Sequence, residues 1–180
     1  MSENRDNPGG IPVPPPLIYL GGLLVGLSLH TARPRPFLPT RDARFLGALL
    51  LGGGALLSLW FGRTMRRAGT PFRLDEPAEV LVTDGPFSFS RNPGYLSFAM
   101  IQGGVASLTN ALWAVLLVPV TVAIVRWCVI EREERYLERE FGSPYLRYKA
   151  QVRRSKLPLQ VAFFSLDYAP PDYRHGNRNE

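Results

Sequence analysis

An uncharged stretch at residues 92–125 limits what this chain can fold into more than any other feature. As one helix it would be about 50 Å long at 1.5 Å per residue, whereas the hydrocarbon core of a bilayer is about 30 Å thick. A single straight crossing therefore cannot use the whole stretch. Thr109 and Asn110 near its middle predict a turn. We expect a helical hairpin of residues 93–108 and 111–130.

Two earlier apolar blocks each fit one further crossing. Residues 13–29 open on three consecutive prolines, which suit a helix start, and residues 45–62 carry no charge and several glycines. Glycines of this kind let helices pack closely in lipid. Hydrophobic residues make up 46% of the chain and are gathered in these blocks, which is typical of a membrane protein. The sequence predicts an all-α, polytopic membrane protein with about four transmembrane helices.

The segments between and after the blocks are polar. We expect residues 1–12 to be disordered, 30–44 to form a loop, and 63–91 to be a polar connection with a brief strand over 79–83. After residue 130 the chain is strongly charged and helix-prone. It predicts an interfacial helix on the cytoplasmic face that breaks at Gly142 and Pro144. We assign residues 13–156 to one membrane domain and 157–180 to a C-terminal tail.

Charge and metal-binding residues narrow the possible partners. The net charge is +6, but the basic residues flank the apolar blocks and match no nucleic-acid motif, so anionic lipid head groups are the expected partners. Cys128 is the only cysteine, and the histidines His30 and His175 lie far apart, so we predict no metal site. Most arginines and lysines near the helix ends share one side with both termini, which predicts that both termini are cytoplasmic.

The chemistry is expected where the polar connection enters the hairpin. Pro93 suits the first turn of a helix, and Ser90 or Asn92 can cap its free N–H groups. A helix start carries a partial positive charge and can bind an anion, here beside Arg91. A well-capped loop without a ligand is the plainer interpretation of this stretch alone.

The hairpin returns the chain beside its own start, which brings a second set of polar residues to this site. Glu133 and Glu134 can therefore meet Arg91, Asn92 and Tyr95. Carboxylates at a membrane entrance are costly without a partner and tend to be functional. By contrast, we expect the remaining acidic residues of this helix to lie on a solvated face, namely Glu131, Glu138 and Glu140.

Four motifs occur together in this order along the chain. They are a GP-[FY] turn and an R-[HN]-P-x-Y helix start in LVTDGPFSFSRNPGYL, then an E-E pair and FG-x-x-Y-x-x-Y in EERYLEREFGSPYLRYKAQV. Together they resemble the isoprenylcysteine carboxyl methyltransferase and phospholipid methyltransferase superfamily of integral membrane enzymes. The resemblance covers about residues 70–152, which we take as the catalytic part.

The resemblance implies S-adenosylmethionine as methyl donor, bound at the cytoplasmic face between the helix start and the post-hairpin helix. It implies catalytic roles for Arg91 and Glu134. The implied cofactor-binding residues are Asn92, Pro93, Tyr95, Glu133, Glu134, Tyr145 and Tyr148. Asn92 replaces the histidine that many members have, which argues against a general-base histidine. Gly94 stands where a bulkier residue is common, which predicts a wider pocket.

The expected acceptor is lipid-like or otherwise hydrophobic, with carboxyl, amine and thiol groups all open. In-line methyl transfer mainly requires the site to align donor and nucleophile and to exclude water. The expected location is a bacterial inner membrane. The alternative from another class is a non-catalytic four-helix membrane protein, either a small transporter or an assembly factor. Ion or proton transport is disfavoured because the crossing segments hold almost no ionisable residue.

Overall fold

The computed structural model describes residues 13–69 and 80–152. The elements of that part, in order, are α1 (Pro15–Ala32), α2 (Thr40–Arg67), the 3-10 turn η1 (Gly85–Ser88), α3 (Pro93–Leu108), α4 (Leu112–Val125), the π-helical turn η2 (Arg126–Ile130), α5 (Glu131–Phe141) and α6 (Ser143–Gln151). The tails predicted at 1–12 and 157–180 lie outside it. The strand predicted over 79–83 is wrong for residues 80–83, which are not in a strand.

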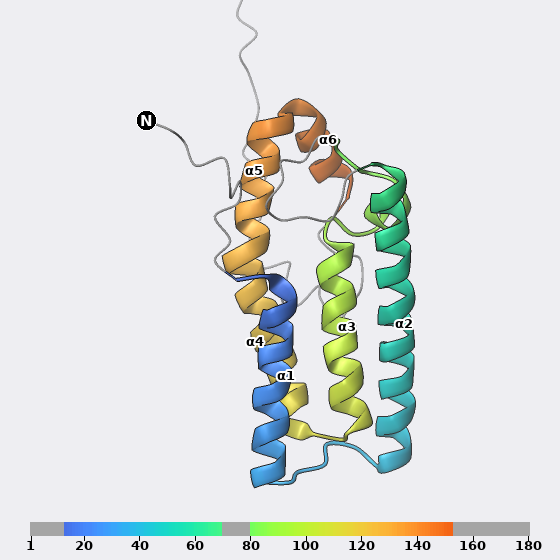
Figure 1. Ribbon diagram of the computed structural model, residues 1–180, viewed down its shortest axis with the longest axis vertical. Coiled ribbons are helices and arrows are strands. Elements are labelled where there is room, and N and C mark those ends of the chain that lie inside the picture. Colours follow the sequence, from blue (N-terminus) through green and yellow to red (C-terminus); the bar gives the residue numbers. More distant parts are fainter. Residues whose placement is uncertain (1–12, 70–79, 153–180) are drawn as a thin grey trace, which may run out of the picture.

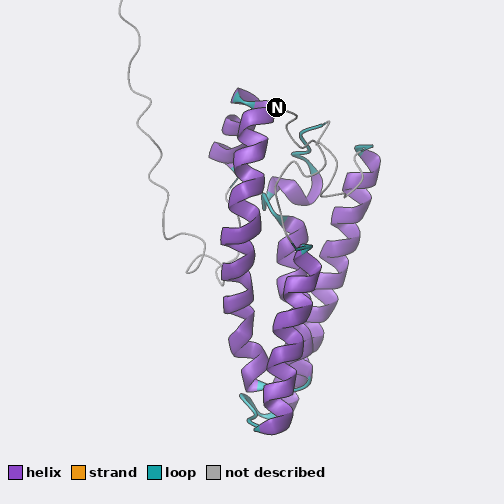
Figure 2. Ribbon diagram, turned by 60° about the vertical axis from the view of Figure 1, so that its left-hand side comes forward, coloured by secondary structure: helices purple, strands orange, loops and turns teal. Residues whose placement is uncertain are grey.

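Helices α1 to α4 lie along the long axis of the molecule and alternate in direction (Figure 1). α2 packs mainly on α3 and α1 mainly on α4, while α3 also contacts α1 and α4. The connection 33–39 and the turn before α4 therefore lie at one end of the bundle. At the other end lie η1, α5 and α6. Figure 2 shows that the described loops gather at these two ends.

Three helical runs in the described part are long and apolar enough to cross a membrane: Pro15–Ala32, Thr40–Arg67 and Leu112–Phe141. Their outer faces expose large apolar side chains, including Phe45 at 74% and Leu56 at 70%. Such a surface suits lipid better than water. α3 is shorter, with 16 residues or about 24 Å, and other helices bury most of it.

The predicted helix boundaries needed correction at charged positions. α2 extends beyond both ends of the 45–62 block because arginines end the apolar stretch without opposing helix formation. The expected loop over 30–44 shortens to residues 33–39 for the same reason. The helix predicted over 111–130 begins at Leu112, becomes π-helical at Arg126 and continues into α5, since no glycine or proline follows until Gly142. Gly142 has a φ of 54° and separates α5 from α6, as predicted.

The predicted turn between α3 and α4 is confirmed, and Asn110 fastens it to the neighbouring connection. This residue has a φ of 51°, a conformation that asparagine tolerates better than most residues. Its Oδ1 accepts hydrogen bonds from the N–H groups of Phe37 and Leu38, and its Nδ2 donates to the Leu38 carbonyl. The end of the bundle away from η1 is thereby closed by side-chain to backbone bonds.

Glycines allow α2 and α3 to approach closely. A Cβ added to Gly104 would lie 2.7 Å from the backbone nitrogen of Leu51, and one added to Gly47 would lie 2.6 Å from the nitrogen of Leu108. Both obstacles are backbone atoms, which cannot rotate away. The expectation that the glycines of the 45–62 block serve helix packing agrees with the geometry at Gly47 and Gly54, whereas Gly52 has no atom within 4 Å of an added Cβ.

Gly104→Ala is therefore expected to lower the thermal stability of the protein in detergent. The added methyl forces α2 and α3 apart, and overpacking of this kind costs about 1–3 kcal/mol. Gly52→Ala is the matched control, because Gly52 is exposed on α2 with no atom within 4 Å of its added Cβ. Equal melting temperatures for the two variants would show that the contact is not tight.

Candidate functional site

A pocket opens at the end of the bundle where α3 begins. Its volume is about 120 Å³, well above the roughly 10–15 Å³ that one water requires, so it can admit a ligand group of several atoms. Its walls come from α2, from the segment that leads into α3 and the first turn of α3, and from α5 and α6. The lining residues are Phe61, Met65, Val80, Leu81, Val82, Phe87, Arg91, Asn92, Pro93, Gly94, Tyr95, Glu133, Glu134, Leu137, Tyr145 and Tyr148.

The start of α3 differs from the predicted capped helix. Pro93 is the first helical residue, as expected, but Asn92 makes no side-chain cap. Ser90 instead accepts a hydrogen bond from the Asn92 N–H at 3.2 Å, which shapes the turn before the helix. The first N–H groups of α3 are thus left without a side-chain cap, and they add partial positive charge beside the pocket.

Arg91 and Asn92 bring buried hydrogen-bond donors to this helix start. The Arg91 side chain is only 10% exposed, and its Nη2 lies 3.4 Å from Oε1 of Glu134. Its Nε and Nη1 atoms, and Nδ2 of Asn92, are buried and have no hydrogen-bond partner in the described part of the chain. Buried donors without partners are costly, so a ligand that accepts hydrogen bonds here would be stabilised.

The acidic wall faces this donor group from α5. The Tyr95 hydroxyl donates a hydrogen bond to Oε2 of Glu133 at 3.0 Å. Glu134, one residue further along, is 4% exposed and contacts Arg91. The hairpin thus brings the two acidic residues to the helix start, as the sequence predicted. A ligand with positive charge would be attracted to this side of the pocket.

Helix α6 covers the pocket with two tyrosines. Tyr145 and Tyr148 are 2% and 7% exposed, and their ring centroids are 6.1 Å apart. The Tyr148 hydroxyl donates to the Phe87 carbonyl at 2.8 Å, which holds α6 against η1. Burial raises the pKa of both phenols, so they stay neutral in the physiological range. The side of the pocket formed by α6 is therefore uncharged at these two positions.

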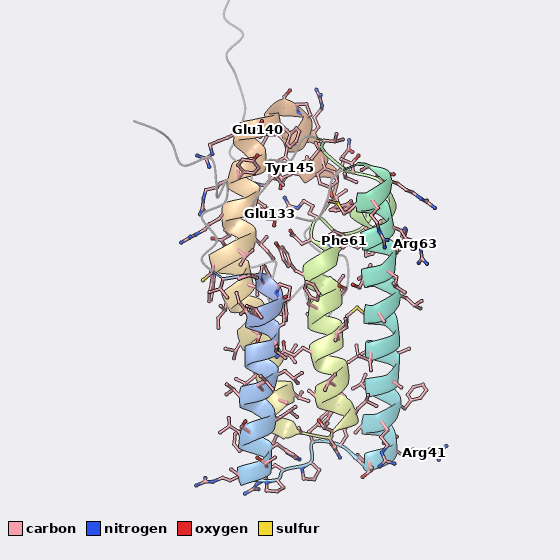
Figure 3. All side chains as sticks on the ribbon, in the orientation of Figure 1. Arg41, Phe61, Arg63, Glu133, Glu140 and Tyr145 are labelled. Carbon is pink, nitrogen blue, oxygen red and sulfur yellow. The ribbon has the colours of Figure 1, made fainter. Side chains whose placement is uncertain are left out.

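The sequence-predicted site residues all line this one pocket. Figure 3 shows Glu133 and Tyr145 at the same end of the bundle, whereas Arg41 lies at the opposite end. Their catalytic and binding roles remain predictions. No group of three or more metal-binding side chains was found among the residues that the structure describes.

Sequence reasoning missed the apolar half of the pocket. Phe61 and Met65 of α2, together with Leu81, Val82 and Phe87, add apolar side chains to its lining. Phe61 belongs to the block expected to cross the membrane, whereas the other four lie in the stretch predicted to be a polar connection. The signals in the sequence were the place of Phe61 and Met65 one turn apart, and the presence of Leu81, Val82 and Phe87 in the stretch that carries the GP-[FY] motif.

The expectation of a wider pocket at Gly94 is also corrected by this wall. The ring of Phe61 lies against α3 there, and a Cβ added to Gly94 would be 3.2 Å from two of its carbons. The room that glycine leaves is therefore filled by an aromatic ring.

Comparison with known families decides the class of the chain. The family model described as phospholipid methyltransferase matches residues 43–144, from α2 to the start of α6. The chain belongs to the phospholipid methyltransferase family. Comparisons with curated proteins and with solved structures gave no match.

Membership of the phospholipid methyltransferase family confirms the resemblance drawn from the four motifs. Together with the three apolar helical runs, it supports an integral membrane protein. It also supports an enzyme of the methyltransferase type. The pocket described above lies largely within the matched range, and only Tyr145 and Tyr148 follow it directly.

Proposed function

We propose that this protein transfers a methyl group from S-adenosylmethionine to a lipid-like or small hydrophobic acceptor at the cytoplasmic membrane face. The observation that carries the proposal is that one pocket holds both the buried donors of Arg91 and Asn92 that lack a partner among the described residues and the carboxylates of Glu133 and Glu134. A ligand with both an anionic and a cationic part matches this arrangement. Family membership points to the same activity.

The residues present fit this donor. Its carboxylate would accept hydrogen bonds from Arg91 and Asn92 at the start of α3, where the helix dipole favours negative charge. Its cationic groups would face the carboxylates of Glu133 and Glu134. When bound, S-adenosylmethionine supplies a methyl group on a positively charged sulfur. A nucleophile can attack the methyl carbon in line with the carbon–sulfur bond, and S-adenosylhomocysteine leaves.

The contribution of the protein is to position the reactants and to exclude water. The bond from Tyr95 fixes the carboxylate of Glu133, and the contact with Arg91 fixes that of Glu134. Tyr145 and Tyr148 close the pocket on the side of α6. Holding two reactants in a productive geometry can remove several kcal/mol, roughly 7–11 in the most favourable systems, from the barrier.

The acceptor is proposed to arrive from the bilayer with its reactive head at the interface. Hydrocarbon tails favour that location by about 0.8 kcal/mol per buried CH₂. A carboxylate or thiolate acceptor is already a nucleophile. An amine acceptor would have to lose a proton, for which Glu134 is the proposed base.

The proposed reaction predicts labelled lipid-like products. Membranes that contain the wild-type protein would be incubated with methyl-labelled donor, and the products separated into organic, volatile and aqueous fractions. We expect label in the organic or volatile fraction, and much less from membranes with Arg91→Ala. Label confined to aqueous small molecules, or equal label from both proteins, would defeat the proposal.

We further propose that α3 is a fourth crossing, that α5 and α6 lie at the interface, and that both termini are cytoplasmic in a bacterial inner membrane. The support is the alternating direction of α1 to α4 and the excess of arginine at the end that holds the pocket. A cysteine placed at Arg67 and another near the C-terminus should both be shielded from an impermeant reagent in intact cells. Labelling of only one would contradict the four crossings.

A further inference from the structure

Phe61 lies where the tight α2–α3 interface ends and the pocket begins. About two turns earlier on α2, a Cβ added to Gly54 would be 3.0 Å from the Ser97 carbonyl, so the two backbones are in contact there. At Phe61 the partner on α3 is Gly94, whose missing side chain leaves room for the ring. The ring therefore fills the end of the interface and forms part of the pocket wall.

The surroundings of Phe61 are apolar on both sides. Inside the pocket its ring centroid lies 5.7 Å from that of Phe87, and Met65 follows one turn later. Its neighbours Leu59 and Trp60 are 51% and 46% exposed on the outer surface of α2. Phe61 thus stands between the pocket and the face of α2 that meets lipid.

Phe61 and Glu133 meet different residues at the start of α3. Successive residues of a helix point about 100° apart. Tyr95 reaches toward Glu133 on α5, whereas Gly94 faces Phe61 on α2. The labels of Figure 3 place Phe61 at the end of the bundle that holds Glu133. A hydrocarbon group suits this wall better than the charged parts of a methyl donor do.

We infer that Phe61 is a specificity-determining residue that, supported by Gly94, sets how bulky the acceptor can be beside its reactive atom. This inference rests on the proposed methyl transfer. A well-packed pocket discriminates one methyl group by roughly 10-fold or more. Truncating the ring should relax that limit, and pushing the ring into the pocket should tighten it.

The test compares wild type with Phe61→Ala, Gly94→Ala and the double variant in a labelled-donor assay. The acceptor probes are phosphatidylethanolamine with zero, one or two N-methyl groups, and linear and α-branched alkanethiols and fatty acids. Phe45→Ala is the control, a phenylalanine at the opposite end of α2 that is 74% exposed. Affinity for S-adenosylhomocysteine is measured for every variant.

For the class of probe that the wild type methylates, Phe61→Ala should raise kcat/KM for the bulkiest member relative to the smallest by about 10-fold. Gly94→Ala should lower that ratio, and the double variant should restore it, because the added methyl no longer meets a ring. The affinity for S-adenosylhomocysteine should stay unchanged throughout, because the proposed donor contacts are those of Arg91, Asn92, Glu133 and Glu134. Phe45→Ala should change neither quantity.

An unchanged ratio in Phe61→Ala would overturn the inference. So would a marked loss of S-adenosylhomocysteine affinity in that variant, since it would place the ring in the donor site. If the wild type binds S-adenosylhomocysteine but methylates none of the three probe classes, the inference about acceptor bulk is wrong while donor binding stands. If it neither binds nor methylates, the proposed function itself fails.

Discussion

Arg91→Ala is expected to weaken S-adenosylhomocysteine binding by about 10- to 100-fold. Hydrogen bonds to charged groups contribute about 1.5–3 kcal/mol, and each 1.4 kcal/mol is a factor of ten in affinity. Two buried nitrogens of Arg91, beside the start of α3, have no partner among residues 13–69 and 80–152, so its interaction with a ligand carboxylate would be made with little competition from water. Calorimetric titration of the purified protein in detergent measures the change.

Two further variants separate this role from a general effect of charge. Arg91→Lys keeps the positive charge but loses the planar fork, so an intermediate loss is expected. Arg139→Ala removes an exposed arginine from α5, and no loss is expected. Thermal unfolding of each variant checks that the fold persists. If Arg91→Ala binds S-adenosylhomocysteine as tightly as Arg139→Ala does, Arg91 stabilises the loop before α3 and does not bind the ligand.

Glu134→Gln is expected to weaken donor binding by about 10-fold or more, and to weaken S-adenosylmethionine more than S-adenosylhomocysteine. The substitution keeps the shape of the side chain and removes its charge. Both ligands carry an ammonium group, but only S-adenosylmethionine has a charged sulfur. A carboxylate that faces the sulfur therefore loses a charge interaction with one ligand only, and two unit charges about 4 Å apart attract by roughly 4 kcal/mol at an effective dielectric constant of about 20.

Glu140→Gln provides the control for this prediction, because Glu140 is exposed at the far end of α5. Glu133→Gln should also weaken binding, since it alters the partner of the Tyr95 hydroxyl. If Glu134→Gln weakens the binding of both ligands equally, the Glu134 carboxylate faces the ammonium group of the ligand and not its sulfur. If neither Glu134→Gln nor Glu133→Gln changes the affinity for either ligand, the two glutamates have a structural role and do not bind the donor.

The helical hairpin, and the residues that it brings together, could be predicted from the length of the uncharged stretch and from the residues at its turn. An uncharged stretch longer than one crossing must turn, and Asn110 tolerates the backbone conformation that the turn needs. A hairpin must also return its end to its start. The meeting of Arg91 with Glu134, and of Tyr95 with Glu133, follows from that return.

Other features depend on contacts between helices that no local pattern encodes. Phe61 belongs to the pocket only because α2 lies against Gly94, and an apolar residue at the end of a crossing helix carries no mark of this. The Asn92 side chain could have capped α3 but makes no cap bond to it. The π-helical turn η2 could not be predicted from the sequence either, since the residues from Arg126 to Ile130 are compatible with an ordinary α-helix.

Titration of the purified wild-type protein with S-adenosylhomocysteine tests the central claim most directly. The site proposed at Arg91, Asn92, Glu133 and Glu134 predicts saturable binding of one molecule per chain. Adenosine, which lacks the amino-acid part that these residues would hold, should bind far more weakly. Absence of binding by folded protein, or equal affinity for adenosine, would contradict a methyl-donor site in this pocket.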